Sequence, residues 1–463
     1  MSCLACGLHE GRANAFDGIL SGRCNMRQTG PNNRCFPTLS ALFPVLFAGL
    51  FVSPGSGAGS APGIRLDSPA RSFQAGLWGM MDQDWDDWDD DWGDWKDGKR
   101  SSVFTRYNRV EGFTAGMRVS RDEGRARHPQ RPFLYGHWGY AFAAGELQYQ
   151  IGIEKGFFET YRFGFGGEYR RMIDTPDRWL MPETENSLAA FLLKEDFHDF
   201  YLSEGGSGYV VQNLTKAVTL HAAYHTEKFQ AVEKNTNWSL FGGGKRFREN
   251  PAVGPGEMRG FSASLAVDTR NSKKVPTRGW YLQIEGERMG DDFGGDFTYD
   301  RVWGDLRRYQ PLGFHDGIDI RLRAGTANGD PPWPKRFYLG GPGTLRGYRY
   351  KAFPDTWSRP GGNRMLLAQV EYRLGKQIFP DDFAFFFLEH FDIILFADAG
   401  WTDTVDSGLD LLDGFDDITY RDIRSDAGLA LASHSGNFRI EIARRTDTGV
   451  KPFMFWVRLN RAF

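Results

Sequence analysis

The sequence predicts an all-β protein, specifically a transmembrane antiparallel β-barrel of about 16 strands. From position 103 to the last residue, segments of about ten residues alternate apolar and polar positions and are separated by turn residues. Aromatic residues make up 15% of the 463 residues and 57 are glycine. No apolar run reaches the roughly 18 residues that a spanning helix needs. The length from 103 to 463 is sufficient for about 16 strands and their turns.

Residues 317–327 illustrate the alternation. Ile318, Ile320 and Leu322 share one face, and charged residues occupy the other. Such a period-two pattern indicates two different solvents on the two faces of a strand. A soluble sandwich with a polar exterior would also give it. The aromatic content, the leader described below and the persistence of a single texture favour a membrane barrel.

Composition excludes several other classes of protein. The formal net charge is −3, so no basic surface indicates a nucleic-acid partner. All four cysteines lie in the first 35 residues. Cys3 and Cys6 have the spacing of a zinc-binding pair, but no second pair follows them. We therefore expect neither a metal nor a cofactor.

Residues 1–58 are predicted to be a signal or leader region. Leu39–Val52 is an apolar run of signal-peptide length, preceded by Arg27 and Arg34 and followed by small residues that suit cleavage near Ala58. Met26 would serve as a start that gives an ordinary n-region. The alternative is that the apolar run is a membrane anchor.

Residues 59–102 are predicted to be an acidic, tryptophan-rich linker. Nine aspartates fall between positions 82 and 97, and four tryptophans recur there every three or four residues. Aspartate is a poor helix former and like charges repel, so we expect a disordered tail. The alternative is that residues 74–98 dock on a periplasmic partner or in the barrel lumen.

Three further elements are expected in the barrel, residues 103–463. The apolar pattern of 187–201 predicts a short amphipathic helix in a large loop. We expect the first strand within 106–119 and the last within 452–463. The last strand has an apolar face that ends on Phe463, and closure of a barrel would protect that edge.

Four motifs in order resemble the BamA/TamA-like bacterial surface-antigen superfamily of outer-membrane barrels. The loop signature is Leu345-Arg-Gly-Tyr348, followed by Gln369-Val-Glu-Tyr-Arg373 and Phe396-Ala-Asp-Ala-Gly400. Upstream, Asp268-Thr-Arg270 and Pro276-Thr-Arg-Gly-Trp280 resemble the hairpin motif of that family. The resemblance covers about 259–463 through motifs, and 103–258 only through texture.

The resemblance implies an extracellular loop that folds back into the lumen. It also implies an arginine–carboxylate contact, which we call the lumenal lock, made by Arg346, Gly347, Tyr348, Glu371, Asp398 and Gly400. A guanidinium grips carboxylates through a planar fork, and glycines permit sharp turns in a crowded space. The hairpin motif residues would be Asp268, Arg270, Pro276 and Gly279, and Phe463 would be the assembly signal. The alternative is that Arg346 pins a plug loop and has no transport role.

The resemblance implies an integral protein of the bacterial outer membrane that assembles, inserts or translocates proteins. Its expected partners are outer-membrane lipids and unfolded outer-membrane protein clients. The periplasmic POTRA modules typical of the family do not fit between positions 58 and 103. The alternative function is a plugged passive pore or structural surface barrel. An enzyme is not expected, since Ser433-His434-Ser435, His221, His225 and the acids of 196–199 match no catalytic motif.

Overall fold

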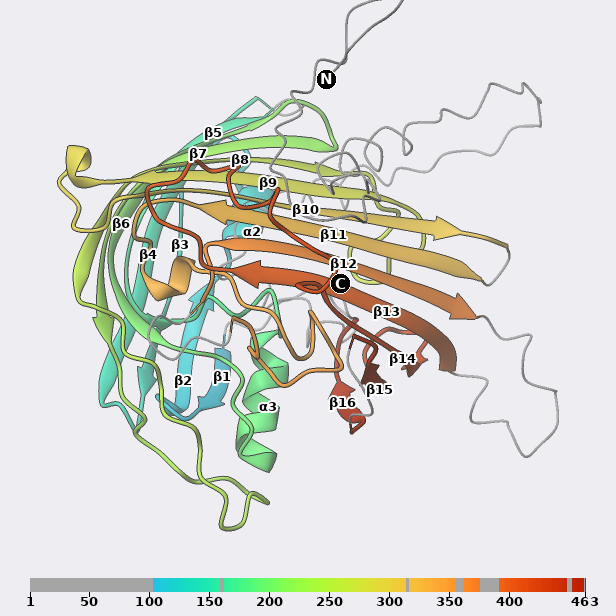
Figure 1. Cartoon of the computed structure of the whole chain (residues 1–463). Helices are drawn as coiled ribbons and strands as arrows, with labels where there is room; N and C mark the ends of the chain where they lie inside the picture. Colours follow the sequence, from blue (N-terminus) through green and yellow to red (C-terminus); the bar gives the residue numbers. More distant parts are fainter. Residues whose placement is uncertain are drawn as a thin grey trace, which may run out of the picture. The chain divides into compact units, whose positions relative to one another are not determined.

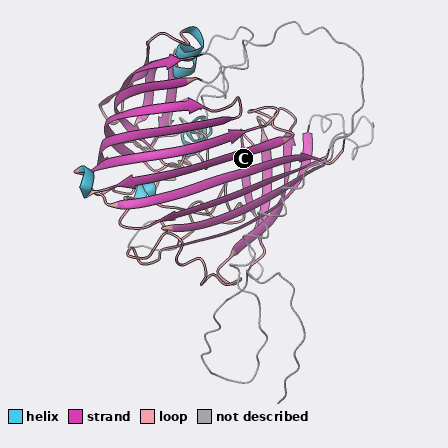
Figure 2. Cartoon of the chain, turned by 90° about the horizontal axis from the view of Figure 1, so that it is seen from above, coloured by secondary structure: helices cyan, strands magenta, loops and turns pink. Residues whose placement is uncertain are grey.

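The computed structural model describes residues 103–158, 162–313, 316–354, 361–374, 391–447, 452–461 and 463. The leader and acidic linker predicted for 1–58 and 59–102 lie outside these residues. Sixteen strands form one antiparallel sheet, and each pairs with the strand before and after it in the chain, from β1 to β16 (Figures 1 and 2). The prediction of an all-β antiparallel barrel of about 16 strands is confirmed.

The elements have the following bounds. The strands are β1 Val103–Asn108, β2 Gly112–Val119, β3 Phe133–Ala141, β4 Glu146–Phe157, β5 Phe163–Asp174, β6 Tyr201–Asn213, β7 Val218–Ala231, β8 Gly256–Asp268, β9 Gly279–Met289, β10 Tyr299–Pro311, β11 Gly317–Ala327, β12 Arg364–Leu374, β13 Phe391–Asp403, β14 Arg424–Ser433, β15 Arg439–Arg445 and β16 Met454–Arg458. The helices are α2 Arg121–Arg127 and α3 Glu183–Leu193, and single 3-10 turns are η3 Asp291–Phe293 and η4 Trp333–Lys335.

The strands bury their charged face and expose their apolar face. In β11, Asp319, Arg321 and Arg323 are buried, whereas the isoleucines and the leucine between them are partly exposed. The outward side chain of Ile151 in the middle of β4 is 64% exposed. This inverted distribution is expected where the outer solvent is lipid and the inner space is polar.

We call the connection between β11 and β12, residues 328–363, the plug loop, and its described residues 328–354 and 361–363 pack on the inner face of the sheet (Figure 1). Its Phe337, Leu339, Leu345 and Tyr348 form a buried cluster with residues of β10 to β12. Three of its glycines, at 340, 341 and 343, have φ between +84° and +116°. Glycine tolerates this conformation, so the sequence allows the loop to turn sharply beside the wall.

The expected first strand, 106–119, is in fact the hairpin of β1 and β2. Asn108 ends β1, and its side-chain oxygen accepts hydrogen bonds from the backbone N–H groups of Val110 and Glu111, at 3.0 and 2.8 Å. Gly112 then has a φ of +66°. Asparagine and glycine favour such turns. These two residues therefore mark a turn inside a segment whose apolar-polar alternation alone predicts one continuous strand.

The expected last strand, 452–463, is also shorter in the structure, because β16 ends at Arg458. Arg461 leaves the strand direction and donates to the carbonyl of Pro276 at 2.7 Å and to Asp319 at 2.8 Å. An inward carboxylate thus attracts the terminal segment. Phe463 is partly exposed beyond this contact.

The structure contains the helix expected in 187–201, but this helix begins and ends earlier in the chain. α3 begins directly after Pro182 and ends before Lys194, whose φ of 60° is left-handed. Phe200, which belongs to the apolar pattern that predicts the helix, lies beyond its end. It is buried in a cluster with Val110, Ile173 and Leu202. Within the described part of the chain, none of the helices combines the length and apolar composition needed to cross a membrane.

Candidate functional site: the plug loop and its anchors

Arg346 is fully buried at the tip of the plug loop and faces three strands. Its Nε and Nη2 each donate to one oxygen of Asp398 on β13 at 2.7 Å. Nη1 donates to Glu371 on β12 at 2.5 Å and lies 3.3 Å from Glu441 on β15. The guanidinium also stacks 3.5 Å from the ring centroid of Phe396. The structure therefore brings Arg346, Glu371 and Asp398 together.

The electrostatics favour a permanently charged arginine. Burial by itself lowers the pKa of Arg346, but the carboxylates of Asp398, Glu371 and Glu441 outweigh burial and raise it well above its usual value. Arg439 donates to Glu371 at 2.8 Å and forms an ion pair with Glu441, also at 2.8 Å, and it adds a second cation to this cluster. A buried charge is tolerated only when it is paired and hydrogen-bonded, and this arrangement meets that condition.

Gly347 and Gly400 permit the close approach of loop and wall. A Cβ at Gly347 would lie 2.6 Å from the Cβ of Asp426, and one at Gly400 would lie 2.8 Å from a methyl of Leu339. Tyr348 is buried, and the guanidinium of Arg445 lies 4.2 Å from its ring centroid. All six residues assigned to the lumenal lock thus lie at the contact between the plug loop and the wall. Their role remains a proposal.

The plug loop has further anchors that the sequence did not reveal. Near its start, Lys335 donates to Glu287 of β9 at 3.0 Å. Near its end, Lys351 donates to Asp177 and Asp199, both at 2.7 Å, and these belong to the connection between β5 and β6. Burial raises the pKa of Asp177. Lysine–aspartate pairs separated by 150 residues or more leave no local pattern, so sequence reasoning had no signal for them.

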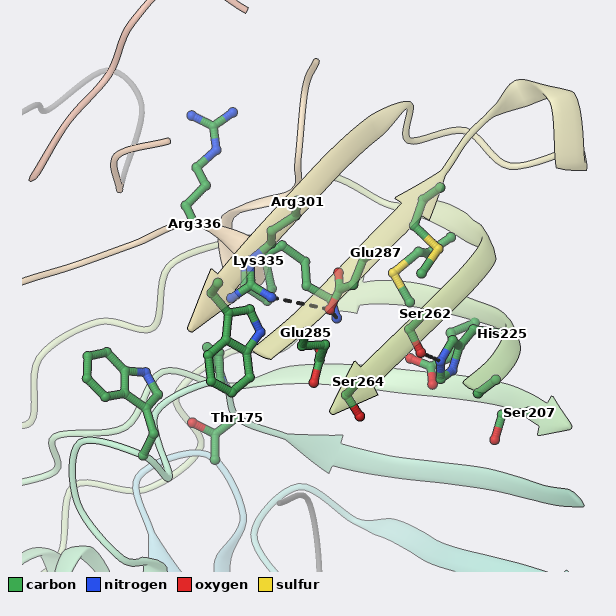
Figure 3. Close-up of a pocket in the computed structure, with 18 of the residues that line it drawn as sticks. Thr175, Ser207, His225, Ser262, Ser264, Glu285, Glu287, Arg301, Lys335 and Arg336 are labelled. Atoms are coloured by element: carbon green, nitrogen blue, oxygen red, sulfur yellow. Dashed lines mark hydrogen bonds and ion pairs between the residues drawn. The ribbon is translucent and has the colours of Figure 1, made fainter. Parts of the chain in front are cut away.

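A polar cavity of about 230 Å³ lies between the start of the plug loop and the inner wall (Figure 3). On one side of the cavity, Glu287 forms ion pairs with Lys335 and Arg301. On another side, His225 and Ser262 share a hydrogen bond of 2.8 Å. Both signs of charge line the cavity. The arrangement suits hydration of the lumen and provides polar partners for loop side chains.

The hairpin motif forms the turn between β8 and β9. Arg270 binds both oxygens of Asp268, at 3.0 and 3.1 Å, and stacks on Tyr281 at 4.8 Å. Gly279 has a φ of +114°, and a Cβ there would lie 2.4 Å from the carbonyl oxygen of Thr269. Pro276 accepts the hydrogen bond from Arg461. These contacts stabilise a tight turn and its link to the terminal segment.

The residues weighed as catalytic candidates occupy separate places. Ser433 and Ser435 hydrogen-bond to each other at 3.1 Å in the turn after β14. His434 contacts Asp392 at 3.1 Å. His221 and His225 lie on β7 and line the cavity. Asp196 and Asp199 lie in the connection between β5 and β6, and both form ion pairs with Arg109, which directly follows β1.

Comparison with known proteins identifies the family. The Omp85 superfamily domain matches residues 154–449, more than half of the chain. The chain is 32% identical over 113 residues to an outer membrane protein assembly factor BamA of Nitratidesulfovibrio vulgaris, covering 23% of this chain and 14% of that protein. It is 33% identical over 91 residues to the sorting and assembly machinery component 50 homolog of Mus musculus, covering 19% of each.

A solved structure of BamA from Haemophilus ducreyi lacking POTRA domains 1–3 is also similar, with 15% identity, a TM-score of 0.49, and coverage of 78% of this chain and 70% of that one. The chain belongs to the Omp85 superfamily. It is an integral β-barrel protein of the bacterial outer membrane, and the predictions of family, fold and location are confirmed. Its matches span less than a fifth of the length of the two curated relatives.

Proposed function

We propose that this protein assists the assembly or insertion of β-barrel proteins into the outer membrane, or their translocation across it. The observation that carries the proposal concerns the edges of the sheet. β1 and β16 have six and five residues and are the two shortest strands. Among the described residues, each pairs with one strand only. We call the junction of β1 and β16 the seam.

A seam of short strands suits this activity for a physical reason. A strand edge presents backbone N–H and C=O groups that an extended client segment can pair with. β6 and β7, by contrast, pair along 13 residues, and separating them would break many more hydrogen bonds. Among the described residues β1 and β16 do not pair with each other, so a client strand can add at the seam without breaking strand-to-strand hydrogen bonds. Outer-membrane lipids and unfolded barrel clients are the partners that this proposal requires.

The anchored plug loop favours a second candidate, a plugged passive pore or structural barrel. Arg346, Lys335 and Lys351 tie the loop to β13, to β9 and to the connection between β5 and β6, respectively. Such a loop would narrow the lumen without any opening of the seam. Both candidates are non-enzymatic, and the separate locations of the serine, histidine and aspartate candidates support that part of the proposal.

The test is folding of a client in liposomes. The full chain is reconstituted, an unfolded outer-membrane β-barrel is added, and its folding is followed by heat-modifiable gel mobility. Empty liposomes and liposomes with an unrelated porin are the controls. Faster folding than in both controls supports the assembly function. No acceleration, together with ion conductance across a planar bilayer, would replace it with the plugged pore.

A further inference from the structure

The helix α3 lies against β1, one of the two strands of the seam (Figure 1). The hydroxyl oxygen of Ser187 accepts a hydrogen bond from the backbone N–H of Tyr107 at 2.7 Å. Glu183 accepts from the side chain of Arg106 at 3.1 Å. The ring of Tyr107 packs edge-on against Phe191 at 5.5 Å between centroids. A helix side chain thus satisfies a backbone donor of the edge strand.

The same helix also contacts the other strand of the seam. Glu185 accepts a hydrogen bond from Nε of Arg458, the last residue of β16, at 2.5 Å. Phe197, just beyond the helix, packs on Trp456 of β16 at 6.1 Å. One helix therefore binds both strands through side chains two positions apart in the sequence.

We infer that α3 is a displaceable latch that bridges β1 and β16 and occupies groups that an incoming strand would need. The inference rests on the proposed function and adds its regulation. An edge strand is commonly protected by a helix or loop that covers it. Here Ser187 takes the place of a strand-to-strand hydrogen bond at Tyr107, and Glu185 holds the side chain of Arg458 at the end of β16. A client strand would gain access to the backbone N–H of Tyr107 only after α3 had moved.

The contacts of α3 are suited to release. Its N-cap residue is Pro182, which provides no side-chain cap, and an 11-residue helix is marginal without tertiary contacts. Burial raises the pKa of both Glu183 and Glu185, a sign of costly desolvation. One carboxylate oxygen of Glu185 has no hydrogen-bond partner among the described residues. A docked helix with unsatisfied buried groups is held less firmly than its contact area suggests.

The latch is connected to the plug loop. Asp177 precedes α3, Asp199 follows it, and Lys351 of the plug loop binds both. The residues between these aspartates include the whole of α3. Release of the plug loop would therefore free the connection that carries the latch.

Hydrogen exchange provides the first test. In the double variant Glu185→Ala and Ser187→Ala, alanine favours the helix, so only the contacts to the seam are lost. Loss of a hydrogen bond worth about 1 kcal/mol predicts about fivefold faster exchange at the Tyr107 amide. Exchange in β6 and β7 should not change. Glu195→Ala, which removes an exposed carboxylate paired with Lys245, is the matched control. Unchanged exchange at the Tyr107 amide would overturn the latch.

The second test is functional. The four native cysteines are replaced by serine, Glu185→Cys and Arg458→Cys are introduced, and a cleavable bifunctional thiol reagent joins them. The joined chain should lose acceleration of client folding, and reduction should restore it. Full acceleration in the joined chain would overturn the latch. If the unmodified chain accelerates no client, the proposed function fails, and the exchange experiment alone decides whether α3 latches the seam.

Discussion

At the scale of single residues, the plug loop depends on the shape of arginine as much as on its charge. Two nitrogens of Arg346 engage both oxygens of Asp398, and a third reaches Glu371 on the neighbouring strand. A lysine would supply one compact ammonium without this planar fork. The loop is thus fixed in orientation and not merely attracted to the wall.

Replacing Arg346 should release the plug loop without unfolding the barrel. Arg346→Ala leaves Glu371 and Asp398 buried and less compensated, at a cost of about 3–5 kcal/mol. We expect the sixteen-strand fold to persist, with heat-modifiable gel mobility, and residues 336–354 to become sensitive to protease. Arg346→Lys should give an intermediate result. Arg349→Ala, an exposed arginine of the same loop, is the control. Wild-type protease resistance in Arg346→Ala would contradict the anchoring role.

His198 should make the connection that carries α3 sensitive to acid. Its Nε2 lies 2.8 Å from the carbonyl oxygen of Met181, and its buried Nδ1 has no hydrogen-bond partner in the part of the chain that the structure describes. Burial lowers its pKa to about 3 from a usual value near 6.5. Between these values the opened connection binds the proton and the folded one does not, so stability is lost as pH falls below about 6.5.

The expected loss is about 1.4 kcal/mol at one pH unit below 6.5. The measurement is hydrogen exchange in residues 175–200, corrected for the intrinsic pH dependence. Glu183 and Glu185 act in the opposite direction, because a raised carboxyl pKa favours the folded state as pH falls. His198→Gln removes only the histidine contribution, so its profile should be flatter between pH 5 and 6.5. Identical profiles for the two chains would exclude the histidine as the cause.

At the scale of elements, the sequence predicts strands well where one face is uniformly charged. β11 shows this, since its alternation matches the observed inward and outward faces. Ends of strands were predicted less well. The expected strand at 106–119 contains a turn capped by Asn108, and the expected strand at 452–463 is shortened where Arg461 meets Asp319. The first of these ends is set by a local turn and the second by a contact between distant residues, and periodicity carries no information on either.

The candidate site was predictable only in part for the same reason. Family motifs placed Arg346, Glu371 and Asp398 in one group, and the structure brings them into contact. Nothing in the sequence pointed to Lys351, because its partners lie in a connection of unrelated pattern. The alternation of β15 does predict that Glu441 faces inward, because the isoleucines on either side of it face outward.

Deleting residues 74–98 should leave the barrel assembled. All sixteen described strands begin at or after Val103, so the deletion leaves each of them intact. We expect normal heat-modifiable mobility and unchanged exchange in β6 to β12. If the acidic tryptophan segment recruits a periplasmic partner, client folding with a periplasmic extract should fall while folding without extract stays the same. Loss of heat-modifiable mobility would show that the segment is needed for assembly of the barrel.

At the scale of the whole molecule, the fold is a polar interior enclosed by an apolar exterior. Leu395, Leu429 and Ile442 lie opposite one another on β13, β14 and β15 and form an outward row near the middle of these strands. Their exposed fractions are 42%, 52% and 38%. In water such a row would be an aggregation surface. In a bilayer, lipid covers this row. The loss of folding stability caused by a charged substitution in the row therefore reports how deeply the row lies in the bilayer.

Leu429→Arg should destabilise the folded barrel in lipid by about 2–4 kcal/mol, because the guanidinium must enter the hydrocarbon region or distort the bilayer. The matched control is Leu412→Arg, at a leucine that is 82% exposed in the connection between β13 and β14. That change should be close to neutral, since the side chain lies outside the strands. The measurement is reversible urea unfolding in phospholipid vesicles, followed by tryptophan fluorescence. Equal effects of the two substitutions would contradict a lipid-facing position for Leu429, whereas a large difference confined to lipid would locate the apolar row inside the bilayer.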